Sequence, residues 1–387
     1  MLVFLLRMSL KNALRHRLRA FLTLAGLTVA ILSFGLLSTV VSAWYAGADA
    51  ASDKRLITRN AISLVFPLPI SYGERIRGAE GVTGISWANW FGGIYIEPKN
   101  FFPQFAIEPA SYLQLYPEFV VKEDERAAFV RDRQGCLVGR KLANRYGWKV
   151  GDNIPIKGTI FPGTWNFVLR GIYDGRDSST DQNQFFFHWD YLNERIKQTA
   201  PRRANNTGVF IVGIRDGSAA AQVSERVDKV FRNSLAETLT ETEKAFQLSF
   251  VAMTETIVLA IQIVSYVVIL IIMAVMANTM AMSARERTAE YATLKALGFG
   301  PGVVGLLILA ESLLLCGIGA ALGIALTWPT VRAIGGALDN IFPVFNVAST
   351  TVWQQLGAAL LVALAAAAVP AQQAMRIRIT EGLRAVS

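Results

Sequence analysis

Four long apolar runs most constrain what this chain can fold into, because each is long enough to cross a lipid bilayer as a helix. A bilayer core takes about 20 apolar helical residues, and the runs occupy residues 21–44, 251–282, 302–328 and 352–370. The fourth run is short and rich in Ala, so a buried helix of a soluble domain is its alternative. Only 17% of the 387 residues are charged, against about 25% in soluble domains, which also indicates a chain that lies partly in lipid.

The first run has a second interpretation, as a cleaved signal peptide. Basic residues precede it, and Val41, Ser42 and Ala43 imitate a cleavage site. The apolar part of a signal peptide is usually about 7–15 residues long, and this run is longer. We therefore expect an uncleaved membrane anchor.

Lys and Arg residues near the ends of the runs predict the orientation of the chain, since cytoplasmic loops carry an excess of both. They cluster before the first run, between the second and third, and after the fourth: Arg7, Lys11, Arg15, Arg17, Arg19, Arg285, Arg287, Lys295, Arg376, Arg378 and Arg384. Only Arg332 lies between the third and fourth runs. We expect residues 1–20, 283–301 and 371–387 in the cytoplasm, and residues 45–250 and 329–351 outside.

The outer segment at 45–250 has the length of a domain. Strand-like runs separated by Gly, Pro, Asn and Asp occupy 61–66, 93–97, 167–173, 184–189 and 208–214. Helical patterns occupy 71–79, 110–116, 139–146 and 218–233. This alternation predicts an α+β domain with two lobes. Residues 235–255 lack Gly and Pro, so we expect a stalk helix continuous from about 235 to 281; a loose linker is the alternative.

The predicted fold is therefore an α-helical membrane protein with four transmembrane helices. A large extracytoplasmic α+β domain is inserted between helices 1 and 2. An amphipathic helix is expected at residues 1–20, before the first span, and a short tail at 371–387 follows the last.

Motifs that carry chemistry are missing from the sequence. It contains no G-x-x-x-x-G-K-[ST] phosphate loop and no H-E-x-x-H or Cys cluster. His16 and His188 fall on opposite predicted sides of the membrane, and so do Cys136 and the third span's Cys316. We expect no catalytic, cofactor-binding or metal-binding residue and no disulfide, with His188 simply packed or on the surface.

The net charge of +9 does not indicate nucleic-acid binding. The basic residues at 15–19 lack interleaved aromatic side chains. We expect them to anchor the chain to anionic membrane lipid, at about 1 kcal/mol per cation.

Glu311 is the charged residue deepest in a predicted span. Counted from Val303, it lies about 12 Å into the third run, where a charge costs about 2.5–3.5 kcal/mol. A buried carboxylate needs a partner, either in a proton or substrate site or in the packing of a helix bundle. Gly317, Gly319 and Gly323 follow it and favour packing, because small residues let membrane helices approach closely.

The charged segment between the second and third runs, "SARERTAEYATLKALGFGPG", predicts a short amphipathic helix. Ser283 is expected to cap it in a capping box with Glu286, and Arg287 and Glu290 are spaced to pair. Gly298 is expected to end it, and Pro301 to separate it from the third span. A solvated connector without a partner is the alternative.

This segment and "LLILAESLLLCGIGAALG" after it resemble the signature of the MacB/FtsX-type ABC transporter permeases. The resemblance extends to "LKNALRHRLRAFLTLAGLTVAI", to "VGRKLANRYGWKVGDNIPIKG" and to "FVLRGIYD". It implies that residues 283–301 form the coupling helix that docks into a separate ATPase, through Arg285, Glu286, Arg287, Glu290, Leu294, Lys295, Leu297 and Gly298. A Glu in the third span, here Glu311, also recurs in the family. Ile379 stands where the family often has Pro.

The resemblance implies a non-catalytic permease subunit in the inner membrane. ATP and Mg would bind in the partner ATPase, whose motion would reach the outer domain to drive export or extraction. A second permease chain, identical or merely similar, and a periplasmic adaptor are the other expected partners. The alternatives are a lipoprotein- or lipid-extracting permease and an FtsX-like signal transducer that regulates a cell-wall hydrolase.

Overall fold

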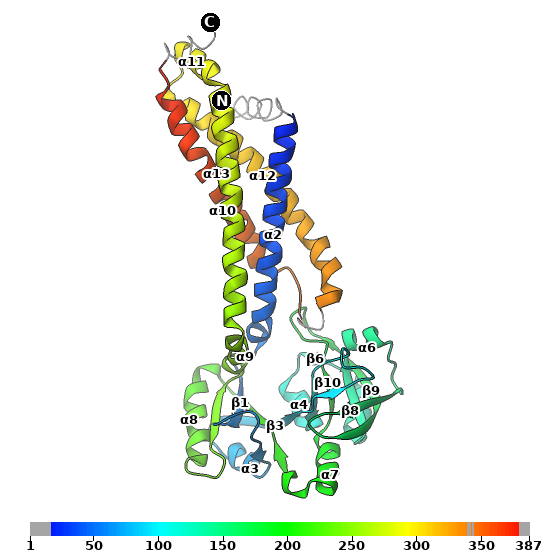
Figure 1. Ribbon diagram of the computed structural model, residues 1–387. Helices are drawn as coiled ribbons and strands as arrows, with labels where there is room; N and C mark the ends of the chain where they lie inside the picture. Colours follow the sequence, from blue (N-terminus) through cyan, green and yellow to red (C-terminus); the bar gives the residue numbers. More distant parts are fainter. Residues whose placement is uncertain (1–16, 339–341, 343, 379–387) are drawn as a thin grey trace. The chain divides into compact units, whose positions relative to one another are not determined.

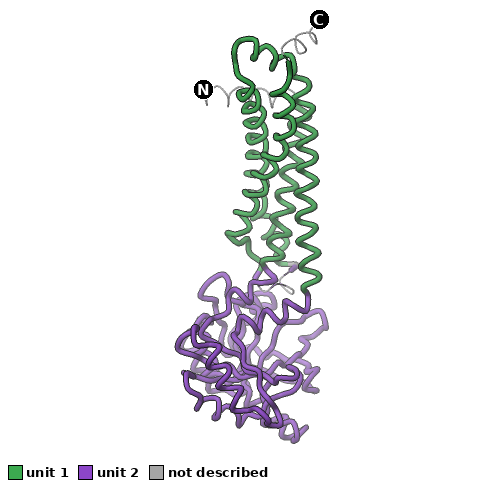
Figure 2. The backbone as a smooth tube through the Cα atoms, turned by 90° about the vertical axis from the view of Figure 1, so that its left-hand side faces the viewer, with its two compact units in different colours: residues 1–42, 255–336, 345–387 green, residues 43–254, 337–344 purple. Residues whose placement is uncertain are grey.

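The computed structural model describes residues 17–338, 342 and 344–378. They form two compact units (Figure 2): a helical unit of residues up to 42, 255–336 and 345 onward, and an inserted domain of residues 43–254 and 337–344. The predicted helix at 1–20, apart from its last residues, lies outside the described residues. The end of the tail, including Ile379 and Arg384, does so as well.

The helical unit contains the four helices that the apolar runs predict. They are α2 (Arg17–Ala50), whose last turns belong to the inserted domain, α10 (Glu255–Glu286), α12 (Pro301–Leu338) and α13 (Ser349–Arg376). All four are long and apolar enough to cross a membrane, the Ala-rich α13 included. The helix α10, with 32 residues, is about 48 Å long at 1.5 Å per residue, which exceeds a bilayer core of about 30 Å.

The helix α12 extends beyond its predicted span. Residues 329–338, expected in the outer loop, are helical, and Pro329 lies inside the helix. A Pro inside a helix removes one backbone donor and strains the preceding turn. Val331, in the following turn, is buried, so packing holds the helix together past the Pro.

Two of the three predicted glycines bring α12 close to α2. A Cβ on Gly319 would lie 2.5 Å from Leu27 Cδ2, and one on Gly323 would lie 2.9 Å from the backbone oxygen of Thr28. Gly317 faces open space instead. Gln355 of α13 adds a polar contact, since its Nε2 donates to the carbonyl of Ile31 and to Thr327 Oγ1, both at 3.0 Å. Small residues and buried amides hold membrane helices together in this way.

The inserted domain is built on an eleven-stranded sheet, counted over the described residues, in the order β13-β1-β12-β3-β5-β10-β7-β9-β8-β4, with β6 paired to β9. Only the pairs β5–β10 and β7–β9 are parallel. The strands are β1 (Arg55–Asn60), β3 (Val82–Trp90), β4 (Gly93–Ile94), β5 (Gln104–Ile107), β6 (Phe119–Val120), β7 (Gly135–Gly139), β8 (Asn153–Gly158), β9 (Gly163–Gly175), β10 (Phe185–His188), β12 (Val209–Ile214) and β13 (Thr238–Thr242). The short strands β2 (Leu68–Pro69) and β11 (Asn206–Thr207) form a second sheet.

Helices cover both faces of the large sheet (Figure 1). They are α3 (Tyr72–Arg77), α4 (Pro109–Leu115), α5 (Glu123–Arg131), α6 (Arg140–Tyr146), α7 (Trp189–Thr199), α8 (Ala220–Phe231) and α9 (Glu243–Met253). The predicted helices at 71–79, 110–116, 139–146 and 218–233 are confirmed as α3, α4, α6 and α8. The predicted strands at 167–173, 184–189 and 208–214 are confirmed as β9, β10 and β12, although β10 is shorter than predicted and Trp189 begins α7.

The two faces of the sheet have differently divided cores, because successive side chains of a strand point to opposite faces. On one face, α4 and α5 pack on a single cluster that crosses the sheet from Ile57 in β1 to Tyr173 in β9; we call it the shared core. The other face carries two clusters, one under α3 and α8 and an aromatic one under α6 and α7. The predicted two lobes correspond to these two clusters, joined by the sheet and the shared core.

Two predicted strands are wrong or shortened. Residues 61–66 are not a strand, and Ile62 and Val65 are exposed. The reason is Asn60, whose Oδ1 accepts from the backbone N of Ile62 at 3.0 Å and turns the chain at the end of β1. The strand β4 stops at Ile94 because Ile96 has a φ of 60°, which a strand does not allow.

The continuous stalk helix from about 235 to 281 is also wrong. Residues 238–242 form β13, and the helix that follows is interrupted at Thr254, between α9 and α10. Thr alternates with Leu and Glu in 238–242, a pattern that favours a strand, and β13 pairs antiparallel with β1. At the interruption, Thr254 Oγ1 donates to the carbonyl of Val251 at 3.0 Å and accepts from Trp44 Nε1 at 2.7 Å.

Candidate functional site

The candidate site is the segment that joins α10 to α12. The helix α10 runs to Glu286, and the short helix α11 occupies Thr288–Ala296. Ser283 therefore lies inside α10 and does not cap a new helix, contrary to the capping box that the sequence predicts. The helix ends where predicted: Gly298 has a φ of 92°, a left-handed conformation that Gly adopts without steric cost.

Glu311 finds its partner in this segment. Arg287 Nη1 donates to Glu311 Oε2 at 2.6 Å, and Nη2 approaches Oε1 at 3.4 Å. Both side chains are 7% exposed, and Ser283 Oγ also lies 3.4 Å from Glu311 Oε1. Tyr291 of α11 is buried near this pair, and burial raises its pKa to about 12. The pair joins the start of α11 to α12, and a buried charge is tolerated only when it is paired.

Glu286 makes a second contact, to α2. Its two carboxylate oxygens accept from Arg19 Nη1 and Nη2 at 2.8 and 2.7 Å. The side chains are 29% and 37% exposed. A bidentate Arg–carboxylate contact fixes geometry, although an exposed pair adds at most about 1 kcal/mol.

Lys295 makes the third contact, to α13. Its Nζ donates to the carbonyls of Ala374, Met375 and Ile377 at 3.2, 2.9 and 2.8 Å. Carbonyls at a helix C-terminus lack partners within the helix and carry partial negative charge. A cation there stabilises the end of α13 and holds α11 beside it.

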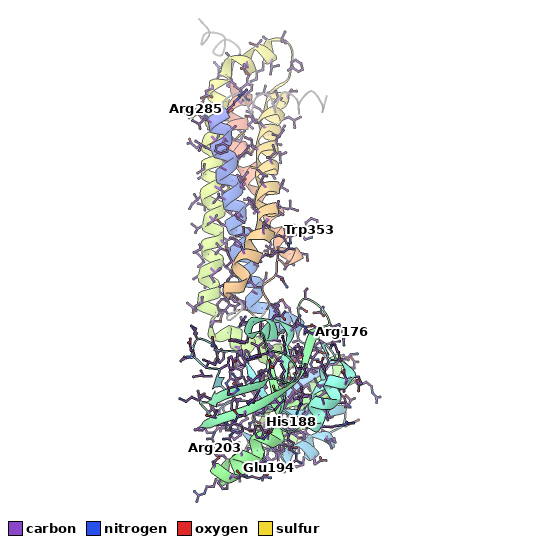
Figure 3. The ribbon with its side chains drawn as sticks, turned by 90° about the vertical axis from the view of Figure 1, so that its right-hand side faces the viewer. Arg176, His188, Glu194, Arg203, Arg285 and Trp353 are labelled. Carbon is purple, nitrogen blue, oxygen red and sulfur yellow. The ribbon has the colours of Figure 1, made fainter. Side chains whose placement is uncertain are left out.

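The remaining residues of the predicted coupling set divide into packed and exposed ones. Leu294 packs against the core of the helical unit, and Glu290 is half-buried. Arg285 is exposed (Figure 3), as are Leu297 at 72% and Phe299 at 41%. The last two flank Gly298 and form an apolar tip at the end of α11, which we call the α11 tip. Phe299 was not among the residues predicted from the sequence.

Other candidate groups lie apart from this segment. His188 is buried in the inserted domain, where its Nε2 lies 2.6 Å from the carbonyl of Phe129, and burial lowers its pKa. Cys136 and Cys316 are buried and free, the first in the inserted domain and the second in the helical unit. Within the described ranges, no three His, Cys, Asp or Glu side chains gather in a group that could hold a metal ion.

Two family models match the sequence. The FtsX-like permease C-terminal model covers residues 262–379, and the MacB-like periplasmic core domain model covers residues 20–230. The second alone spans more than half of the chain. Together they reach from the start of α2 to the end of α13.

Two relatives carry the description of ABC transporter permeases. The chain is 24% identical over 340 residues to an uncharacterized ABC transporter permease of Methanocaldococcus jannaschii, and the match covers 82% of this chain and 81% of that one. It is 23% identical over 262 residues to an uncharacterized ABC transporter permease protein of Mycobacterium tuberculosis, with 65% of this chain but only 29% of that longer protein covered.

Solved structures similar to the chain include two domains of ABC transporters. One is the extracellular domain of the ABC-type transporter YknZ from Gram-positive bacteria, with a TM-score of 0.36, 8% identity and coverage of 49% of this chain and 98% of that one. The other is the periplasmic region of MacB from Actinobacillus actinomycetemcomitans, with a TM-score of 0.36, 8% identity and coverage of 52% and 94%.

Proposed function

The chain belongs to the MacB/FtsX-type family of ABC transporter permeases, and from this we propose that it is the subunit that transmits ATP-driven motion to an outer domain. A separate ATPase subunit binds and hydrolyses ATP with Mg. Its movement displaces α11, and the inserted domain responds on the outer side of the membrane. The work done there is the export or extraction of a substrate, and this chain itself catalyses no reaction.

The observation that carries this proposal is the set of contacts made by the α10–α11 segment. Glu286 contacts α2, Arg287 contacts α12 and Lys295 contacts α13, while α10 continues directly into the segment. The segment that contains α11 is thus bonded to α2, α12 and α13 and is continuous with α10, so a shift of the segment would displace all four long helices. That is the property a helix needs if a push on it is to move a membrane bundle as a whole.

The charges of the helical unit support an orientation with this end in the cytoplasm. Arg17, Arg19, Arg285, Arg376 and Arg378 belong to the helix ends around α11, and such residues concentrate on the cytoplasmic side. Both termini are then cytoplasmic, the inserted domain is extracytoplasmic, and the cations also contact anionic membrane lipid. The further partners are a second permease chain, identical or similar, and a periplasmic adaptor.

The docking contact with the ATPase is better assigned to the α11 tip than to the charged residues of the coupling set. The charges of Glu286, Arg287 and Lys295 face other parts of this chain. Leu297 and Phe299 are exposed apolar side chains, and such side chains form the centres of protein–protein interfaces. Glu286 and Arg287 then act by holding the tip in place.

The test is recruitment of the ATPase subunit, which is first identified by co-expressing the chain with the products of neighbouring genes and is then co-purified with it in detergent. Leu297→Asp places a charge in the apolar tip and should abolish recruitment. Leu235→Asp makes the same change at an exposed leucine of the inserted domain and should leave recruitment intact. Glu286→Ala with Arg287→Ala should reduce recruitment less than Leu297→Asp. Normal recruitment by the folded Leu297→Asp chain would remove the docking assignment.

Extraction of a lipid or lipoprotein is the second candidate, and one observation favours it. Ile62, Val65 and Phe66 are exposed at 82%, 85% and 51% in the loop after β1, which gives the inserted domain an apolar surface for an acyl chain. Photo-crosslinkers at Val65 should capture lipid or lipoprotein if this candidate holds, and a soluble export substrate if it does not. An FtsX-like transducer would instead bind a cell-wall hydrolase through this domain.

A further inference from the structure

We propose that Arg55 is a positioning residue that clamps α9, the helix directly before α10, to both lobes of the inserted domain. This inference rests on the proposed function, because the clamp matters for transport only if motion of the membrane helices reaches the domain. It adds the residue through which that motion would pass from α9 into the body of the domain.

Arg55 opens β1 and contacts α9, the end of α4 and the loop that follows α4. Its Nε donates to Glu243 Oε2 at 2.8 Å, Nη2 donates to Glu118 Oε1 at 2.6 Å, and Nη1 donates to the carbonyl of Leu115 at 2.9 Å. The guanidinium also lies 4.1 Å from the ring centre of Tyr116. Each nitrogen of the Arg55 guanidinium therefore makes a hydrogen bond, and its side chain is only 7% exposed.

Glu243 ties this cluster to α9. It is the first residue of that helix, where a carboxylate is favoured by the helix dipole. Its Oε2 also accepts from the backbone N of Ser52 at 2.9 Å. The segment that leads from α2 into β1 and the segment that leads toward α10 are thus held by one carboxylate.

The cluster keeps its charge although it is buried. Burial lowers the pKa of Arg55, but the carboxylates of Glu243 and Glu118 raise it more, so the pKa lies above its ordinary value. Burial also raises the pKa of Tyr112 and of Tyr116, so both phenols stay neutral. One cation thus holds two carboxylates, and removing it leaves both without their cationic partner.

The position of the cluster connects α9 to the far half of the sheet. Leu115 ends α4, and Glu118 directly precedes β6, which pairs with β9. Phe246 of α9 packs against the shared core, which crosses the sheet from β1 to β9. Through Arg55, α9 is therefore bonded to the face that both lobes share, rather than to its neighbouring strand alone.

A second ion pair in the same strand supplies a matched control. Arg59 Nε donates to Glu241 Oε1 at 2.8 Å, with side chains 17% and 20% exposed. This pair joins β1 to β13, which the backbone already pairs, and it reaches neither α9 nor α4. A substitution at Arg59 removes an arginine from β1 but leaves the contacts of Arg55 unchanged.

The experiment uses the full chain in complex with its ATPase subunit in lipid nanodiscs. Spin labels at Ser249→Cys in α9 and Asp124→Cys in α5, both exposed positions, report the distance between α9 and the helix that packs over β7 and β9, the far half of the sheet. The native Cys136 and Cys316 are buried and so are protected from the label. Arg55→Lys keeps the positive charge, but a Lys lacks the planar set of donors with which Arg bonds both carboxylates and the carbonyl at once. Arg59→Lys makes the same change at the control position.

Arg55→Lys should broaden the distance distribution without nucleotide, while wild type and Arg59→Lys stay narrow. The Arg55→Lys complex should retain ATP hydrolysis. When it is trapped with ATP and vanadate, however, the distance between Asp124→Cys labels on the two permease chains should not change as it does in wild type. A residue with a merely structural role would lower yield and hydrolysis together.

A distribution in Arg55→Lys as narrow as in wild type overturns the clamp, and so does a nucleotide shift of wild-type size. The variant Glu243→Gln checks the result from the other partner and should broaden the same distribution. If the label distance in the wild-type complex does not change on nucleotide trapping, the proposed function is contradicted instead. The clamp is then still tested by the width of the distance distribution measured without nucleotide.

Discussion

Two buried Arg–Glu contacts, one in each unit, use the same residue types but are built differently. Arg287 and Glu311 in the helical unit pair one cation with one carboxylate, each side chain 7% exposed, with Ser283 Oγ 3.4 Å from the carboxylate and Tyr291 buried nearby. Arg55 in the inserted domain holds Glu243, Glu118 and a backbone carbonyl and lies over Tyr116. The first joins two elements, and the second joins β1, α9 and the end of α4.

The difference indicates which substitutions each contact should tolerate. A buried pair of equal and opposite charges can often be replaced as a whole by apolar side chains at little cost, whereas removing one partner costs about 3–5 kcal/mol. A cation shared between two carboxylates cannot be replaced by two substitutions, because removing Arg and one Glu still leaves the second carboxylate without its donor; all three charges would have to change together. Two substitutions should therefore be able to replace the contact in the helical unit, whereas the one in the inserted domain needs at least three.

The largest effect is expected in the inserted domain. Arg55→Met should lower the free energy of unfolding by about 3–5 kcal/mol, because it leaves two carboxylates unpaired. Adding Glu243→Leu should not restore stability, since Glu118 and the carbonyl of Leu115 still lack their donor. Thermal unfolding of the full chain in detergent measures both variants, and a double variant as stable as wild type would break the comparison.

A smaller effect is expected for the pair in the helical unit. Arg287→Met alone should cost about 3 kcal/mol, since it strands a buried carboxylate. Arg287→Met together with Glu311→Leu should recover most of that loss. Glu286→Gln, which weakens the exposed pair with Arg19, is the control and should cost less than about 1 kcal/mol. If the double variant is no more stable than the single one, the pair is not replaceable.

The smallest expected effect is a dependence of stability on pH, which should be present in the inserted domain and absent from the helical unit. His188 is buried and its pKa is lowered, so the unfolded chain binds a proton at a higher pH than the folded one does. The stability of the inserted domain should therefore fall as pH drops below about 6.5, the ordinary pKa of His. The described part of the helical unit contains no His and should lack this dependence. Hydrogen exchange at pH 7 and pH 5.5 measures both units, and His188→Gln should flatten the response of the domain.

Much of the fold could be predicted because its signals are local. The four spans follow from the length of the apolar runs, and α8 follows from the spacing of Val223, Val227 and Phe231. The stalk could not be predicted in the same way. Residues 238–242 carry a period-two pattern that favours a strand, but the absence of Gly and Pro in 235–255 favoured a helix, and pairing with β1 decides between them.

The same distinction between local signals and contacts of distant residues holds for the candidate site. The segment around α11 could be located from its charges, from Gly298 and from its resemblance to a family. The partners of those charges could not be named, because Arg287 and Glu311 are 24 residues apart and meet only through helix packing. The Arg55 cluster had no signal at all, since Glu118 and Glu243 lie 63 and 188 residues away and are brought together by the order of the strands.

The order of those strands has a consequence for how such permeases diversify. The first and last strands of the inserted domain, β1 and β13, lie side by side and pair antiparallel, so the polypeptide leaves the domain next to the place where it came in. A domain whose two ends lie side by side can be inserted into another protein without changing the fold of that protein. We expect recombination to have exchanged whole inserted domains at this junction.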